Sequence, residues 1–147
     1  MEAARRHLSS EQEVLDFGCG TGDLTLAIAE IVKSVQAIDT SPGMLEVAQA
    51  RASDVGNVTF TNSSIDDIRR SENTFHVVTA FNVLQYVEDI EADARKFANL
   101  VSPEGLFISS TACLSERRSL LGLLVLALTK LGIMPKTRFC KKSELRT

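Results

Sequence analysis

Residues 14–30 read VLDFGCGTGDLTLAIAE, in which Gly18, Gly20 and Gly22 occupy every second position after an apolar run. The run Glu13–Phe17 predicts a short buried strand, and the residues after the last glycine repeat apolar side chains at helical spacing. Glycine accepts positive φ and carries no Cβ, so such a turn brings backbone amides close to a polar or anionic ligand. The stretch therefore predicts a strand, a ligand-binding turn and a helix. A tight turn that packs strand on helix is the alternative interpretation.

Strand and helix patterns alternate along the rest of the chain. Further strands are predicted at Ser34–Asp39, Asn57–Asn62, Phe75–Phe81 and Gly105–Ser110. Helices are predicted over 23–32, 42–52, 89–101 and 116–132, the second of them with Ser41 as N-cap and Pro42 at its first position. This alternation predicts an α/β protein with a parallel sheet and right-handed crossovers. Its ligand is expected at the carboxyl ends of the strands, near the switch point.

Composition favours one ordinary globular domain in a reducing, cytoplasmic setting. The chain has 147 residues and a net charge of −3, so no global positive field draws it to nucleic acid. Its three cysteines form no CxxC pair, so neither a zinc site nor a disulfide framework is expected. The longest apolar run, Leu120–Leu128, is far shorter than the roughly 20 residues of a membrane span. We therefore expect no transmembrane segment, no metal and no nucleic-acid partner.

The charge beside the glycines separates two classes of ligand. A dinucleotide fingerprint has GxGxxG spacing, whereas this chain has GxGxG followed by Asp23. Asp16 also stands two residues before the first glycine, where it would be an unfavourable neighbour for a pyrophosphate. A carboxylate at that place suits a ligand with an ammonium or sulfonium group, through charge attraction and charge-assisted hydrogen bonds.

On these residues the chain resembles the class I S-adenosylmethionine-dependent methyltransferases of the small-molecule type (methyltransferase domain 11/25-like). The resemblance is carried by LDFGCGTG at 15–22, AIDTSPGMLEVAQA at 37–50, FHVVTAFNVLQYVED at 75–89 and LVSPEGLFISS at 100–110. It implies a Rossmann-like, doubly wound, mostly parallel sheet of strand order 3-2-1-4-5. It also implies S-adenosyl-L-methionine as cofactor and a small molecule as methyl acceptor.

The same resemblance implies the site residues. The expected cofactor-binding residues are Asp16, Gly18, Cys19, Gly20, Thr21, Gly22, Asp39, Thr40, Met44, Ser64, Ile65 and Asn82, and the expected substrate-binding residues are Gln85 and Tyr86. Asp16 is expected near the cofactor's ammonium, and the backbone carbonyl of Asn82 is expected to face it. Ser64 is a departure, because the family often has an acid there for the adenine amino group. Asp66 would replace that acid if the loop shifted by two residues.

Some of these residues have a structural alternative. Asp39 ends a predicted strand, where a carboxylate can accept hydrogen bonds from both ribose hydroxyls, but it could instead cap the next helix. Met44 would cover the adenine or fill the core. Tyr86 would meet the substrate or pack at a helix entry. These alternatives stay open on the sequence alone.

The sequence identifies no catalytic residue. His76 begins its predicted strand, which places it roughly 10 Å or more from the strand's carboxyl end, so we interpret it as structural. Cys19 has no visible base and is interpreted as a loop residue, while His7 precedes the first strand. Methyl transfer requires chiefly that the protein orient the reactants, because the cofactor supplies the activated carbon.

The end of the chain predicts an incomplete domain. Family members usually add a helix and a β-hairpin where this chain reads FCKKSELRT, so residues 1–147 are expected to form one domain that lacks those strands. The exposed sheet edge or the apolar helix 119–134 is then a candidate homodimer contact. The apolar helix also suggests a hydrophobic acceptor. A non-catalytic cofactor-binding module is the alternative function, followed by an NAD-dependent oxidoreductase.

Overall fold

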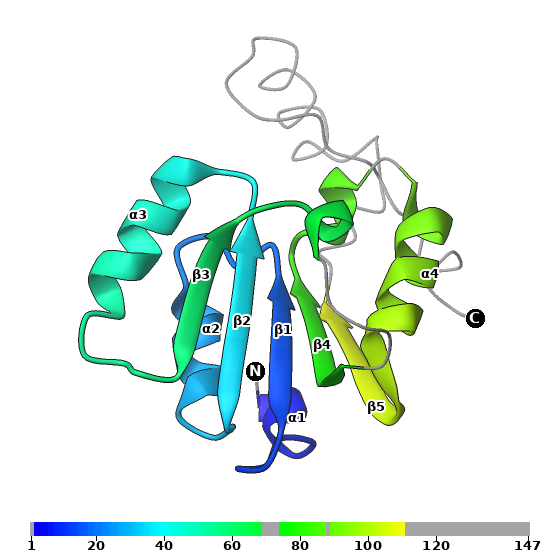
Figure 1. Cartoon of the computed structure of the whole chain (residues 1–147), viewed down its shortest axis with the longest axis horizontal. Helices are drawn as coiled ribbons and strands as arrows, with labels where there is room; N and C mark the ends of the chain where they lie inside the picture. Colours follow the sequence, from blue (N-terminus) through cyan, green and yellow to red (C-terminus); the bar gives the residue numbers. More distant parts are fainter. Residues whose placement is uncertain (1, 69–73, 88, 111–147) are drawn as a thin grey trace, which may run out of the picture.

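A computed structural model describes residues 2–68, 74–87 and 89–110 of the chain. In these ranges five parallel strands form one sheet of order β3-β2-β1-β4-β5 (Figure 1). The strands are β1 (Glu13–Phe17), β2 (Ser34–Asp39), β3 (Val58–Asn62), β4 (Phe75–Phe81) and β5 (Val101–Ser110). The strand order confirms the expected Rossmann-like, doubly wound fold.

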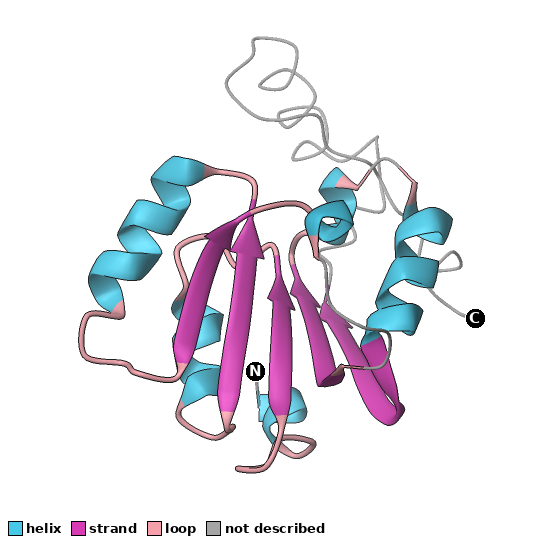
Figure 2. Ribbon diagram, in the orientation of Figure 1, coloured by secondary structure: helices cyan, strands magenta, loops and turns pink. Residues whose placement is uncertain are grey.

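Helices cover both faces of this sheet, as Figure 2 shows. The α-helices are α1 (Glu2–Arg5), α2 (Asp23–Ala29), α3 (Pro42–Arg51) and α4 (Ile90–Leu100), and two 3₁₀ turns are η1 (Ile65–Asp67) and η2 (Leu84–Tyr86). Asp89 caps α4 by accepting a hydrogen bond from the backbone N of Ala92. Of the helices in the described ranges, none is long and apolar enough to cross a bilayer.

Two hydrophobic clusters explain why the central strands are apolar on both sides. Val14 packs with Ile28 of α2 on one face, while its neighbour Leu15 packs with Phe97 of α4 on the other. Both Val14 and Leu15 have no exposed surface. A parallel sheet that is covered on both faces requires such continuous apolar strands. The packing fixes β1 at the centre of the sheet and brings the turn after Phe17 to the middle of its carboxyl edge.

The last strand differs from its prediction. We predicted a strand at Gly105–Ser110, but β5 begins four residues earlier, at Val101. The added part of β5 pairs irregularly, because the register jumps from Phe75↔Val101 to Val77↔Leu106. Gly105 permits this jump, since a Cβ there would lie 2.7 Å from the carbonyl O of His76. The predicted helix 116–132 and the stretch FCKKSELRT, after which the family's hairpin strands were expected to be missing, lie outside the described residues.

Candidate functional site

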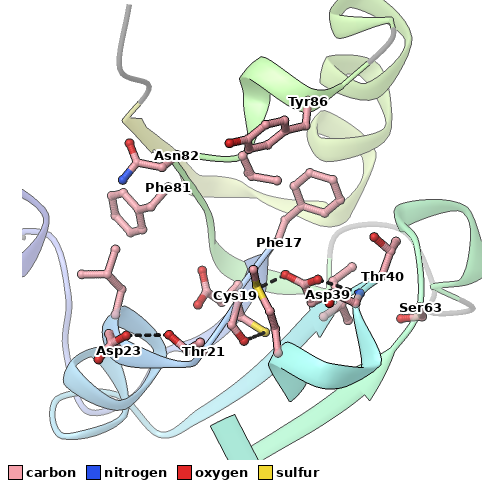
Figure 3. Close-up of a pocket in the computed structure, with 18 residues that line it drawn as sticks. Phe17, Cys19, Thr21, Asp23, Asp39, Thr40, Ser63, Phe81, Asn82 and Tyr86 are labelled. Carbon is pink, nitrogen blue, oxygen red and sulfur yellow. Dashed lines mark hydrogen bonds between the residues drawn. The ribbon is translucent and has the colours of Figure 1, made fainter. Parts of the chain in front are cut away.

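A pocket of about 760 Å³ opens at the carboxyl ends of β1, β2 and β4 (Figure 3). This volume lies within the range of roughly 300–1,000 Å³ that is usual for small-molecule sites. The lining residues are Asp16, Phe17, Gly18, Cys19, Gly20, Thr21, Asp23, Leu24, Ile38, Asp39, Thr40, Ser41, Met44, Ser63, Phe81, Asn82, Val83 and Tyr86. The position agrees with the rule that ligands of such sheets bind beside the topological switch point.

The glycine turn forms the floor of this pocket. Its backbone is tied to β2, because the amides of Gly18 and Cys19 donate to the carbonyl of Ile38 at 2.8 and 3.1 Å. Gly18 has a φ of 70°, and a Cβ at this position would lie 2.3 Å from Cγ2 of Val83. Only glycine fits that backbone and that close approach. The turn is therefore built to pack tightly on one side and to present bare backbone to the pocket.

Asp39 joins the glycine turn to the end of β2. Its Oδ2 accepts a hydrogen bond from the backbone N of Gly20 at 2.8 Å, and its Oδ1 accepts one from the backbone N of Ser41 at 2.8 Å. A carboxylate oxygen has a second lone pair, so both oxygens of this half-buried group can still accept a hydroxyl from a ligand. Asp39 is thus both a structural clamp and an acceptor in the pocket wall.

Asp16 lies deeper, with 3% of its surface exposed. Its Oδ2 accepts a hydrogen bond from Thr25 Oγ1 at 2.6 Å, and its Oδ1 accepts one from Thr79 Oγ1 at 2.7 Å. Burial raises the pKa of Asp16, the two threonine hydrogen bonds oppose that rise, and the nearby charge of Asp39 adds to it. The pocket floor therefore holds a buried carboxyl group, close to Asp39, whose two oxygens are both held by hydrogen bonds.

The pocket as a whole is acidic. Its lining includes the carboxyl groups of Asp16, Asp23 and Asp39, and no lysine, arginine or histidine among the described residues. Arg51 pairs with Asp23 at 2.8 Å, but both side chains are largely exposed and Arg51 does not line the pocket. Such a field favours a ligand that carries positive charge and disfavours a pyrophosphate.

Cys19 does not behave as a nucleophile in this setting. Burial raises the pKa of its thiol to about 12, with further contributions from the negative charges of Asp16 and Asp39. A thiol with this pKa is protonated at neutral pH, whereas nucleophilic cysteines need a thiolate. The geometry supports the interpretation of Cys19 as a loop residue.

The turn after β4 supplies the opposite wall. Asn82 has a φ of 53°, a left-handed conformation that few residues other than glycine adopt. The backbone N–H of Asn82 donates a hydrogen bond to the backbone carbonyl of Ser110 at 2.6 Å. The backbone carbonyl of Asn82 accepts one from Nε2 of Gln85 at 2.8 Å. Tyr86 follows with 44% of its surface exposed, and Figure 3 shows its ring across the pocket from the glycine turn.

The structure brings most of the predicted site residues together. Those that line the pocket are Asp16, Gly18, Cys19, Gly20, Thr21, Asp39, Thr40, Met44, Asn82 and Tyr86. Gly22, Ser64, Ile65 and Gln85 do not line it. Contacts of these four residues with a cofactor or substrate stay predictions.

Local structure explains why those four residues lie elsewhere. Gly22 is the N-cap of α2, and its Cα faces Ala48 of α3. Ser64 caps η1 through Asp67, and Ile65 is buried in the core. Asp66 pairs with Lys96 at 2.6 Å, outside the pocket lining.

Other lining residues were missed by the sequence reasoning. They are Phe17, Asp23, Leu24, Ile38, Ser41, Ser63, Phe81 and Val83. Phe17 and Phe81 are the last residues of β1 and β4, so the strand-end rule alone could have identified them. Ser63, the first residue after β3, takes the place in the lining that was expected for Ser64.

The histidine expected to be structural lies at the far end of β4. Nδ1 of His76 accepts a hydrogen bond from the backbone N of Glu13, the first residue of β1, at 3.0 Å. Within the described ranges no three histidine, cysteine or acidic side chains come close enough together to hold a metal ion.

Comparison with known proteins decides the family. A family model described as "Methyltransferase domain" matches residues 14–105, which include the glycine turn, nearly all of β1, the whole of β2, β3 and β4, and the first half of β5. The chain belongs to this methyltransferase domain family.

Relatives of this methyltransferase domain include proteins named ubiquinone biosynthesis O-methyltransferase. This chain is 30% identical over 142 residues to the protein of that name from Rickettsia felis, and the match covers 92% of this chain and 57% of the relative. This chain is 31% identical over 148 residues to the mitochondrial ubiquinone biosynthesis O-methyltransferase from Schizosaccharomyces pombe, and the match covers 95% of this chain and 54% of the relative. The chain spans about half the length of these two relatives.

A solved structure confirms the fold. The YcgJ protein from Bacillus subtilis matches this methyltransferase domain with a TM-score of 0.80 and 24% sequence identity. The match covers 97% of this chain and 62% of that protein.

Proposed function

We propose that this methyltransferase domain binds S-adenosyl-L-methionine and supports transfer of its methyl group to a small-molecule acceptor. The observation that carries the proposal is the acidic pocket over the glycine turn, which is lined by both Asp16 and Asp39. The fit is chemical as well as steric. The ligand brings a sulfonium, an ammonium and two ribose hydroxyls, and the pocket offers carboxylate oxygens and open backbone.

Each part of the cofactor has candidate partners in the lining. We expect Asp39 to accept hydrogen bonds from the ribose hydroxyls. Each of its oxygens accepts one backbone amide and retains a second lone pair, which supports this contact. Ile38 and Met44 offer apolar surface for the adenine, and Ser63 is the polar group after β3. Asp16 lies on the side of the turn where the ammonium is expected.

The protein's part in the reaction is orientation. S-adenosyl-L-methionine supplies a methyl carbon that is already activated by the attached sulfonium. The glycine turn, Asp39 and the β4 turn hold the reacting groups in line, and such positioning can contribute roughly 7–11 kcal/mol. We expect the acceptor to approach beside Tyr86, and the left-handed backbone of Asn82 fixes the direction of this wall.

We further propose that the acceptor is apolar and is methylated on a hydroxyl oxygen. The names of the two relatives, which refer to O-methylation in ubiquinone biosynthesis, support this substrate class. The lining supports it too, because Phe17, Leu24, Phe81 and Val83 place apolar surface beside the polar turn. These four apolar side chains would exclude water from the side of the pocket where we expect the acceptor to bind.

The proposal also includes the cellular compartment and the oligomeric state of the domain. We expect the domain to be cytoplasmic, to act on a small molecule and to pair with a second copy. Support for pairing comes from β5, which is an edge strand among the described strands and carries Leu106 and Phe107 with 40% and 43% of their surfaces exposed.

Calorimetric titration tests the proposed cofactor. We expect S-adenosylhomocysteine to bind the chain with measurable heat and NAD to give none, because the pyrophosphate of NAD would face the carboxylates of Asp16 and Asp39. Binding of NAD without binding of S-adenosylhomocysteine would favour an oxidoreductase instead. Binding of S-adenosylhomocysteine without turnover over a broad panel of phenolic and quinol acceptors would favour a non-catalytic module.

A further inference from the structure

A buried polar cluster joins three elements beneath the pocket. Asp16 of β1, Thr25 of α2 and Thr79 of β4 have 3%, 0% and 0% of their surfaces exposed, and they are the buried polar or charged residues of the described ranges. Asp16 and Thr79 are register partners across β1 and β4. Thr25 reaches the same carboxylate from the helix that follows the glycine turn.

The hydrogen bonds in this cluster have a definite direction. A hydroxyl has one proton to donate, and Thr79 Oγ1 lies 2.7 Å from Asp16 Oδ1 but 3.3 Å from the carbonyl of Leu15. The shorter contact is therefore the donated one. Thr25 Oγ1 lies 2.6 Å from the other carboxylate oxygen. Both lengths are typical of O–H···O⁻ bonds to an ionised acceptor.

The surroundings otherwise oppose a charge on Asp16. Burial raises the pKa of this carboxyl, and the charge of Asp39 from β2 raises it further. Cys19, from the turn, is protonated at neutral pH and contributes no charge of its own. No cationic side chain among the described residues lines this part of the molecule. The two hydroxyls, from α2 and β4, are thus the groups that favour the ionised form.

We propose that Thr25 and Thr79 are positioning residues that hold Asp16 as an oriented, ionised carboxylate for the ammonium group of the bound cofactor. The inference rests on the proposed function, since it assigns a role to residues beneath the same site. Neither threonine lines the pocket, so each acts through Asp16 and not by touching the ligand.

The test measures affinity as a function of pH with two ligands. S-adenosylhomocysteine carries the ammonium, and 5′-methylthioadenosine has the same nucleoside without the amino acid. The variants are Thr25→Val and Thr79→Val, with Thr79→Ser as the conservative replacement. Thr59→Val is the matched control, because Thr59 is an exposed threonine on β3.

We expect each buried valine variant to bind S-adenosylhomocysteine about tenfold more weakly at pH 7, as for loss of a hydrogen bond to a charged group. Removing a hydroxyl donor raises the pKa of Asp16 further. The affinity of wild type falls as the pH drops through that pKa, and in the valine variants the fall begins at a higher pH. Thr79→Ser and Thr59→Val should follow wild type, and 5′-methylthioadenosine should bind all variants alike.

Two failures are distinguishable. If wild type does not bind S-adenosylhomocysteine at any pH, the proposed function and this inference both fall. If wild type binds but the valine variants follow its pH profile, or lose 5′-methylthioadenosine equally, the inference alone is wrong. A carboxyl-carbon NMR titration of wild type, assigned with Asp16→Asn, does not depend on the folding of the valine variants. A protonated Asp16 at pH 7 in the free protein would overturn the inference.

Discussion

The Gly18→Ala variant is expected to lose about 2–5 kcal/mol of stability and to lose ligand binding. The added methyl group would lie 2.3 Å from Cγ2 of Val83, in a backbone with a φ of 70°. Overpacking of this kind costs about 1–3 kcal/mol, and a left-handed conformation costs a non-glycine residue about 1–2 kcal/mol more. Urea unfolding measures the stability, and titration with S-adenosylhomocysteine measures the binding.

Two variants separate the contact from the conformation. Gly20 has a similar φ of 55°, but a Cβ there would lie 3.6 Å from Met44 Sδ, which is ordinary contact. Gly20→Ala should therefore lose only the conformational part, about 1–2 kcal/mol. A Cβ at position 18 would lie 2.3 Å from Cγ2 and 2.6 Å from Cβ of Val83, so Val83→Gly, added to Gly18→Ala, removes both close atoms. The double variant should therefore recover part of the stability that Gly18→Ala loses, less the packing that Val83 supplies. Equal losses in Gly18→Ala and Gly20→Ala would show that the approach of Val83 is not as described.

Asp39→Ala should weaken binding of S-adenosylhomocysteine by about 100-fold or more. The change removes a carboxylate that we propose accepts both ribose hydroxyls, and hydrogen bonds to charged groups contribute about 1.5–3 kcal/mol each. It also frees the amides of Gly20 and Ser41, so the glycine turn is no longer tied to β2. The affinity should be measured well below the melting temperature of the variant, so that the protein is folded.

Asp23→Asn is the matched control for Asp39→Ala. Asp23 is also a carboxylate of the lining, but its side chain is 72% exposed and it pairs with Arg51. Such surface pairs contribute little, so we expect less than about a threefold change in affinity. If Asp23→Asn weakens binding as much as Asp39→Ala does, net pocket charge governs the affinity and the proposed ribose contact is wrong.

The central sheet could be predicted from sequence to the residue, whereas its edge could not. The bounds of β1, β2 and β4 agree with prediction because each is an apolar run closed by a polar or glycine turn. The predicted first residue of β5, Gly105, was wrong, because the strand begins at Val101. Its pairing depends on how Gly105 passes the carbonyl of His76, a contact that no local pattern encodes.

The part of the site that is formed by the backbone at the strand ends could be predicted from the sequence. The glycine turn and Asp39 follow strand ends, and the topology brings strand ends together. Side-chain directions were not predictable. Ser64 turns away because it caps η1 through Asp67, and its neighbour Ser63 lines the pocket instead. The threonine partners of Asp16 depend on the register between β1 and β4 and on the placement of α2, which only the folded chain shows.

A crystal structure of the protein with S-adenosylhomocysteine tests the central claim most directly. We expect the ligand to lie over the glycine turn, with both ribose hydroxyls within hydrogen-bond distance of the Asp39 carboxylate and the ammonium on the side of Asp16. An empty pocket at saturating ligand, or a bound ligand whose ribose points away from Asp39, would contradict it.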